Sequence, residues 1–297
     1  MRDSIIYLQL LTSISFHPTI YPAIYPQFTP LSRMFSLKGS GASSEETKKK
    51  VEPAAPPAYS ALKTTFASIS LHEGDYLRLL QFPQKDIDAL RGVIKQSWPK
   101  GIQKEQLRYN SCFEFKLRGE PWNGSNWTGQ ESIPSRILMR EIFAYLFSAA
   151  WILHASNNDT LIFRQQHIAP PACDWISVTF HKTDRLRLIG ASTELIASFR
   201  ELLRGEELLQ DEFWKEQEHN AWEFKMKGTP GMYLGEDMVK GGLLFLRMVE
   251  TLETHGWSLY SNTTRHLTTQ NGLIIFDNGW FCVKDKHWAP GMPLFRG

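Results

Sequence analysis

The chain has 297 residues, 42% of them hydrophobic, with ten tryptophans and eighteen phenylalanines, which is enough apolar material for two packed domains. Acidic and basic residues nearly balance at a net charge of +2, which argues against a nucleic-acid partner, and no apolar run reaches the roughly 18 residues of a membrane span. Three widely spaced cysteines, Cys112, Cys173 and Cys282, fit free thiols in a reducing compartment. We therefore expect a cytoplasmic protein, with the nucleus as the alternative compartment.

Residues 1–65 are predicted to be a disordered arm and linker. Four prolines within residues 1–33 remove backbone donors and block helix formation, and Met34 is an alternative start to Met1. Residues 34–65 are rich in Gly, Ser, Ala and Pro and carry a charge cluster at residues 45–50. This composition predicts a segment that precedes the fold without joining its core.

The linker contains Pro56-Pro57-Ala58-Tyr59, which resembles the P-P-x-Y ligands of WW domains. Such ligands present a pre-formed polyproline II turn, so little entropy is lost when the prolines and the tyrosine dock on aromatic side chains. A four-residue pattern also arises by chance in a linker rich in Pro and Ala. Both interpretations stay open: Pro56, Pro57 and Tyr59 as a partner-binding motif, or an ordinary linker.

From Phe66 onward the chain consists of two copies of one unit, residues 66–170 and residues 171–297 with a C-terminal tail. Glu114-Phe115-Lys116 recurs 109 residues later as Glu223-Phe224-Lys225, and each triplet is followed by Gly and Pro at the same spacing. Apolar and charged residues alternate around both triplets, which indicates a half-buried strand. An internal duplication is therefore the main organising feature of the sequence.

Each copy reads as β-β-α-β-α-β. A hairpin over 68–80 matches one over 177–189, and short helices follow at 87–94 and 196–203, the second with Ser192 as N-cap. After the repeated strand come longer helices at 135–150 and 236–254, which are apolar on several sides, and final strands at 160–163 and 273–276. Because such helices are usually buried on several sides, we predict an α+β fold in which the two repeats form a pseudo-two-fold pair with one shared core.

The pattern Glu114-Phe-Lys-Leu-Arg-Gly-Glu-Pro-Trp122, with Arg185-Leu-Arg-Leu-Ile189 and Gly256-Trp257, resembles a set of fungal proteins. These proteins carry a tandem EFK-hydrophobic-K/R-G-x-P-W unit behind a Pro-rich N-terminus. The resemblance covers roughly residues 56–285 and implies no particular activity. The second copy departs from the pattern at Gly231, where the first has Trp122, so a site lined by Trp122 would exist in the first repeat alone.

The duplicated charges are the candidate site residues: Arg78, Glu114 and Lys116 in the first copy, and Arg187, Glu223 and Lys225 in the second, with Trp122 as a further candidate. Each Arg–Glu pair is expected on the face of the sheet opposite the apolar side chains, with the two strands either parallel neighbours or separated by one strand. Two interpretations are open. They are cross-strand ion pairs on a solvated sheet, or an acid and a base in a pocket.

No catalytic fingerprint accompanies these residues. The sequence lacks the nucleophile elbow, the phosphate loop and the dinucleotide fingerprint, and its histidines show no metal-ligand spacing, so we expect no cofactor and no metal. The favoured hypothesis is a non-enzymatic adaptor whose P-P-x-Y motif recruits a WW-domain protein of the ubiquitin-ligase type. The alternative is an enzyme or small-molecule binder with its site in the cleft between the repeats; the oligomeric state stays open.

Overall fold

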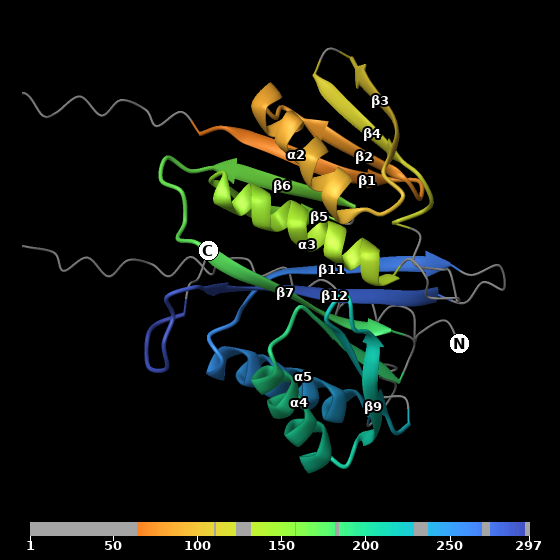
Figure 1. Ribbon diagram of the computed structural model, residues 1–297, viewed down its shortest axis with the longest axis vertical. Helices are drawn as coiled ribbons and strands as arrows, with labels where there is room; N and C mark the ends of the chain where they lie inside the picture. The colour runs from red at the N-terminus through yellow and green to blue at the C-terminus, as the bar shows by residue number, and fades with distance from the viewer. Residues whose placement is uncertain are drawn as a thin grey trace, which may run out of the picture. The chain divides into compact units, whose positions relative to one another are not determined.

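The computed structural model describes residues 64–109, 111–122, 132–157, 159–181, 184–228, 237–268 and 274–294. Within these residues the chain forms the order β-β-α-β-β-α-β-β twice (Figure 1). The predicted arm and the motif Pro56-Pro57-Ala58-Tyr59 lie outside the described residues. None of the helices in the described ranges is long and apolar enough to span a membrane.

The first repeat contains one antiparallel sheet and two helices. Its elements are β1 (Phe66–His72), β2 (Tyr76–Leu80), α2 (Gln84–Ser97), β3 (Ile102–Arg108), β4 (Cys112–Leu117), α3 (Ser132–Ser148), β5 (Trp151–Asn157) and β6 (Thr160–Gln165). The strands are hydrogen-bonded in the order β3-β4-β2-β1-β6-β5, and we call this sheet 1.

The second repeat has the same topology. Its elements are β7 (Cys173–His181), β8 (Arg185–Ile189), α4 (Thr193–Gly205), β9 (Leu209–Glu216), β10 (Ala221–Met226), α5 (Asp237–Thr254), β11 (Ser258–Thr268) and β12 (Ile274–Asp285). The order β11-β12-β7-β8-β10-β9, which we call sheet 2, is that of sheet 1 when the strands of the two repeats are matched in chain order.

The predicted α+β fold with two tandem repeats is confirmed, but each repeat has two strands more than the sequence predicted. β3 and β9 form the edge of each sheet beside β4 and β10, and β5 and β11 directly follow the longer helices. The added strand β3 reverses the chain before β4, so β2 and β4 are antiparallel neighbours and not parallel ones as predicted. Their register places Arg78 directly opposite Glu114 and Leu79 opposite Phe113, which confirms the predicted separation of charged and apolar faces.

The helices of each repeat cover one face of their own sheet. In the first repeat, buried residues of β1, β2 and β4 form one core with Leu90 and Ile94 of α2 and Ile142 of α3. The buried carboxylate of Asp86 joins helices and sheet, because it accepts hydrogen bonds from the hydroxyl of Tyr145 and the indole of Trp151. We call the opposite face of each sheet, which does not face the helices of its own repeat, the back face.

In the second repeat, Ser192 caps α4 as predicted: its hydroxyl accepts a hydrogen bond from the Leu195 amide at 3.3 Å. This contact satisfies one of the free amides at the helix N-terminus. The corresponding cap position of α2 is Pro83, whose ring offers no acceptor, so the two short helices begin in different ways. Four apolar residues of α4 then enter the second core: Leu195, Ile196, Phe199 and Leu203.

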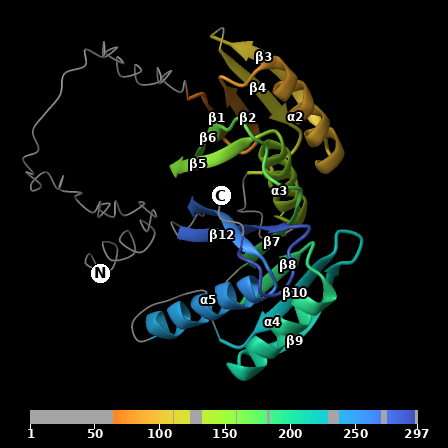
Figure 2. The ribbon, with the colours of Figure 1, turned by 90° about the vertical axis from the view of Figure 1, so that its left-hand side faces the viewer.

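The two repeats pack head to tail. Helix α3 of the first repeat contacts its own sheet and also lies on the back face of sheet 2, against β7 and β8 (Figure 2). Its Phe143 meets Phe281 of β12 with ring centroids 5.0 Å apart, and its Phe147 meets Trp175 of β7 at 5.4 Å. A pseudo-two-fold pair would place α5 on sheet 1 in the same way, but α5 packs within its own repeat. It contacts α4 and β11, and its Phe245 lies against Phe180 of β7 and Trp280 of β12. The prediction that both long helices are covered on several sides therefore holds for α3 and not for α5.

Candidate functional site

The first Arg–Glu pair lies on the back face of sheet 1. The Arg78 guanidinium donates from Nε to Glu114 Oε2 at 2.5 Å, and the other carboxylate oxygen accepts from Gln106 Nε2 at 2.5 Å and lies 3.2 Å from Arg108 Nε. The Glu114 side chain is fully buried beneath these groups. Burial opposes ionisation, but the hydrogen bonds from Arg78 and Gln106 and the two arginine charges outweigh it, so the pKa of Glu114 lies below its ordinary value.

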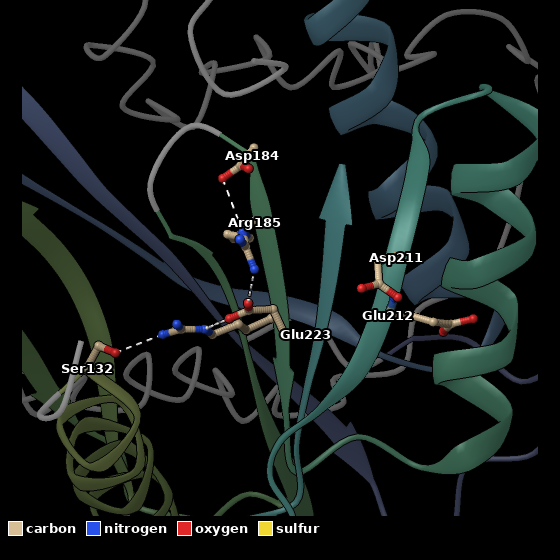
Figure 3. Close-up of polar contacts among 7 residues, drawn as sticks. Ser132, Asp184, Arg185, Asp211, Glu212 and Glu223 are labelled. Carbon is tan, nitrogen blue, oxygen red and sulfur yellow. Dashed lines mark hydrogen bonds and ion pairs between the residues drawn. The ribbon is translucent and has the colours of Figure 1, made fainter. Parts of the chain in front are cut away.

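The second pair has the same register and a more enclosed setting. Arg187 Nε donates to Glu223 Oε2 at 2.5 Å, Arg185 Nη1 donates to Oε1 at 2.7 Å, and Arg187 Nη1 donates to the hydroxyl of Ser132 at 2.8 Å (Figure 3). Ser132 begins α3, so this cluster lies where the first repeat meets sheet 2. Burial opposes ionisation here as well, but the charge and hydrogen bonds of Arg187 and Arg185 lower the pKa of Glu223.

The two glutamates are thus buried carboxylates, each with both oxygens bound by basic or amide donors. The cross-strand ion pairs match one of the two interpretations of the sequence, but the two carboxylates are themselves shielded from water, because Glu114 and Glu223 are 0% and 2% exposed. A lowered pKa favours the ionised form, whereas a general acid at neutral pH needs a raised one. The arrangement is suited to fixing strand register and, in the second copy, to fixing α3 on sheet 2.

The other predicted residues do not gather around these pairs into one site. Lys116 Nζ lies 3.1 Å from the hydroxyl of Tyr76 and 3.5 Å from Asp75, beside the β1–β2 turn. Lys225 is half-buried on β10, in register with Arg185 on β8 and with Asp211 on β9. The two sets of candidates therefore form separate clusters, one in each sheet.

Trp122 lies inside the first core and is only 4% exposed. Its backbone amide donates to the carbonyl of Gly74 at 2.9 Å, which joins the segment after β4 to the β1–β2 turn. The ring therefore contributes to packing at the end of sheet 1. Pro56, Pro57 and Tyr59 lie outside the described residues.

A second duplicated ion pair was not predicted from the sequence. Arg91 of α2 donates to Glu105 of β3 at 2.7 Å, and Arg200 of α4 donates to Glu212 of β9 at 2.5 Å. Each guanidinium also lies over an aromatic ring of the neighbouring strand, Arg91 over Phe113 and Arg200 over Trp222. Both pairs attach the short helix to the edge hairpin. The signal for them was hidden because the edge strands themselves were not predicted.

The described part of the chain also has an open hollow of about 550 Å³ in the first repeat. It lies where the start of α2 meets β3, β4 and β5, and its lining combines aromatic rings with side-chain amides: Phe82, Phe113, Trp151, Gln81, Gln84 and Gln165. Its volume falls within the range of small-molecule sites. The described residues contain no group of three or more His, Cys, Asp or Glu side chains placed to hold a metal ion.

Comparison with known proteins gives one finding. A single domain-family model matches the chain twice, over residues 65–164 and again over residues 174–276. The searches of curated proteins and of solved structures returned no match. The two matched ranges coincide closely with the two repeats, from β1 to β6 and from β7 into β12. The chain therefore belongs to this domain family and carries two tandem copies of its domain.

Proposed function

We propose that the protein is a non-enzymatic adaptor. In this proposal the tandem repeats form a binding module, and Pro56-Pro57-Ala58-Tyr59 recruits a WW-domain protein of the ubiquitin-ligase type. The observation that carries the proposal is the way in which the duplicated Arg–Glu pairs are bound within the two sheets. Glu114 and Glu223 are both enclosed by arginine donors, which is how a scaffold stabilises strand register and differs from the accessible, pKa-raised groups that acid–base catalysis needs.

The sequence supports the recruiting motif by its context. Two adjacent prolines pre-form the extended turn that a WW domain binds, and the tyrosine two residues later supplies the aromatic anchor. The motif precedes β1 by only a few residues, so a partner bound there would be brought next to the first repeat. An adaptor has this organisation: a short recruiting peptide joined to a folded recognition module.

The test is a pull-down of the full chain on an array of purified WW domains, followed by calorimetry with the strongest binder. We expect Tyr59→Ala to abolish capture, because the tyrosine fills its own slot on the WW surface. Tyr25→Ala is the matched control, since Tyr25 also lies in the proline-containing N-terminal segment, next to Pro26, but belongs to no P-P-x-Y sequence. Equal capture of the wild type and Tyr59→Ala would refute the proposal.

A second candidate function is the binding of a small molecule, with or without chemistry. The sequence placed such a site between the repeats, whereas the hollow that favours this candidate lies inside the first repeat. Its aromatic rings and amides suit a flat ligand that combines an apolar face with hydrogen-bonding edges. We expect fragments of this kind to raise the melting temperature of the wild type.

Leu107→Glu tests the hollow directly. Leu107 lines it and is 63% exposed, so a charge there changes the lining without disturbing a core. Ile168→Glu is the control, because Ile168 is also exposed and does not line the hollow. Stabilisation by the same fragments in the wild type and in Leu107→Glu would exclude this site.

A further inference from the structure

The contact between the two repeats provides a template for a second contact. On the side of α3 that faces sheet 2, Ile133 belongs to a buried cluster with Ile189 of β8 and Ala221 of β10. Phe147 belongs to another with Val283 of β12. The same side carries Ile137, Arg136, Arg140 and Phe143. These residues define the helical half of the template, and the back face of sheet 2 is its other half.

Helix α5 presents the corresponding side to solvent. The helices correspond at a shift of 106 residues, since the buried stripe Leu138, Ile142 and Leu146 of α3 is matched by Leu244, Met248 and Leu252 of α5. At the same shift, the positions of Ile133, Ile137 and Arg140 are occupied by Val239, Leu243 and Leu246. These three side chains are 68%, 50% and 61% exposed. Three large apolar side chains on one side of a helix are unusual at a surface without a partner.

The back face of sheet 1 is equivalent to the back face of sheet 2, on which α3 packs. Among the described residues, no helix packs on it in the same way. Its strand registers match those of sheet 2, so Phe66 occupies the position of Trp175 and Leu80 that of Ile189. Phe66 and Leu80 are 38% and 40% exposed, whereas Ile189 is fully buried under α3.

The two exposed surfaces are also complementary in residue size, with the large and small residues on opposite partners from those in the template. In the template, the Arg136 and Arg140 guanidiniums lie so close to Gly279 and Gly190 that a Cβ on either glycine would collide with them. On the free surfaces, α5 has Gly242 and Leu246 at the arginine positions, and sheet 1 has Thr160 and Gln81 at the glycine positions. Where the template sets a large helix residue on a small sheet residue, the free surfaces offer smaller helix residues and larger sheet residues, so the space can be filled in both cases.

Charge complementarity supports the same match. The apolar positions of Phe147 and Val283 correspond to Glu253 at the end of α5 and to Arg164 on β6, and both of these are exposed. Repeating the template between two molecules would bring a carboxylate and a guanidinium together where the template has two apolar groups. Opposite charges at the rim of a contact favour one register over others.

We propose that the protein associates with itself head to tail: the side of α5 defined by Val239, Leu243 and Leu246 in one molecule packs on the back face of sheet 1, at Phe66 and Leu80, in a second copy. The contact repeats between molecules the packing of α3 on sheet 2 within each molecule. Because the two surfaces differ, the contact is heterologous, and each added copy presents the same free surfaces again.

Sedimentation velocity of the full chain over a range of concentrations tests this proposal. The wild type should show a mass that rises beyond the dimer with concentration. Leu243→Glu on the helix side and Leu80→Glu on the sheet side should each be monomeric alone, because each variant has lost one of the two surfaces. An equimolar mixture of the two should form a dimer and stop there, because one intact helix side and one intact sheet side remain. Leu107→Glu, an exposed apolar residue outside both surfaces, should associate like the wild type.

A charge exchange tests the register. Glu253→Arg and Arg164→Glu should each weaken association several-fold, and the double variant, which restores opposite charges, should recover it. At a concentration where the wild type is monomeric, circular dichroism and the melting temperature should be the same in all variants, since every substituted side chain is at least 40% exposed or lies at the exposed rim. A wild type that is monomeric at all concentrations, or a mixture of the two blocked variants that fails to dimerise, would overturn the proposal. A monomeric wild type would leave another protein, or residues 1–63 of the chain itself, as the candidate occupants of these surfaces.

Discussion

Replacing the paired arginine in each repeat compares how much stability the same Arg–Glu ion pair contributes when it is buried and when it is partly exposed. Arg187 and Glu223 are 4% and 2% exposed, and Arg187→Met removes the donor while filling most of its volume. Breaking a buried pair typically costs about 3–5 kcal/mol, and because Arg185 still binds the other oxygen of Glu223, we take the lower end, about 3 kcal/mol.

The matched change in the first repeat is Arg78→Met. Arg78 is 26% exposed, so water reaches the site, and Glu114 keeps Gln106 and Arg108 as donors. For a pair that is only partly exposed and whose carboxylate keeps other partners, we expect a loss of about 1 kcal/mol. The difference of about 2 kcal/mol corresponds to a melting temperature about 4–8 °C lower for Arg187→Met than for Arg78→Met in a domain of this size.

Equilibrium unfolding in urea, followed by tryptophan fluorescence, gives both free energies of unfolding. A double-mutant cycle with Glu223→Gln then isolates the coupling between the two side chains from the cost of each change alone. Equal losses for Arg78→Met and Arg187→Met would show that enclosure by the first repeat does not strengthen the second pair, and would refute the reasoning. Strictly additive losses in the cycle would show that the pair itself contributes nothing.

Three further predictions concern pH, packing and thiol reactivity. The pKa values of Glu114 and Glu223 are lowered in the folded state, so the stability that these carboxylates contribute is present above their ordinary value of 4.5 and is lost as the pH falls through the lowered values. The urea midpoint of Glu223→Gln should therefore fall less than that of the wild type when the pH is lowered below 4.5. Trp122→Ala should destabilise the protein by about 3–5 kcal/mol in urea titrations, as expected for a core residue, whereas a surface ligand-binding tryptophan would show little loss. Burial raises the pKa of the Cys173 thiol to about 11 and that of Cys282 further, so iodoacetamide labelling at pH 8, read by mass spectrometry, should modify Cys282 only after unfolding and Cys173 slowly; rapid labelling of Cys282 in the native protein would contradict its position in the core.

The duplicated core was predictable from the sequence, but the outer strands were not. β4 and β10 have one apolar face, which makes their pattern alternate, and the exact spacing of 109 residues between the copies made the duplication visible. β3 is an edge strand exposed on both faces, with Lys104 and Glu105 in its middle, so it has no alternation to detect. Its stability comes from pairing with β4, which a pattern within one strand does not reveal.

The strands after the long helices were hidden for a different reason. Only two residues separate α3 from β5, and the reversal is made at the second of them, Ala150, whose φ of 64° is rare for a residue other than glycine. The second copy has Gly256 at the same position, with φ of 83°. A glycine directly before Trp257 was therefore the signal for a helix end followed by a strand, and the alanine in the first copy concealed it.

The relation between the repeats was beyond the reach of the sequence. Both long helices are rich in apolar residues, and this similarity suggested equivalent surroundings. The structure shows different ones: Ile137 faces the second repeat, whereas Leu243 at the matching position is half exposed. Burial on a second side depends on where the other repeat lies, and the composition of one helix carries no information about that position.

Because α3 packs on sheet 2, side-chain contacts as well as the backbone hold the two repeats together. The segment at residues 166–172 connects the repeats, but side chains such as Tyr260, whose hydroxyl accepts the Leu153 amide at 2.8 Å, hold them together. If the backbone were cut in that segment, each half would keep a face that matches the other. We therefore expect two separately expressed fragments, 1–170 and 171–297, to reassemble spontaneously, so that the chain can serve as a split reporter whose halves regain one cooperative melting transition when mixed.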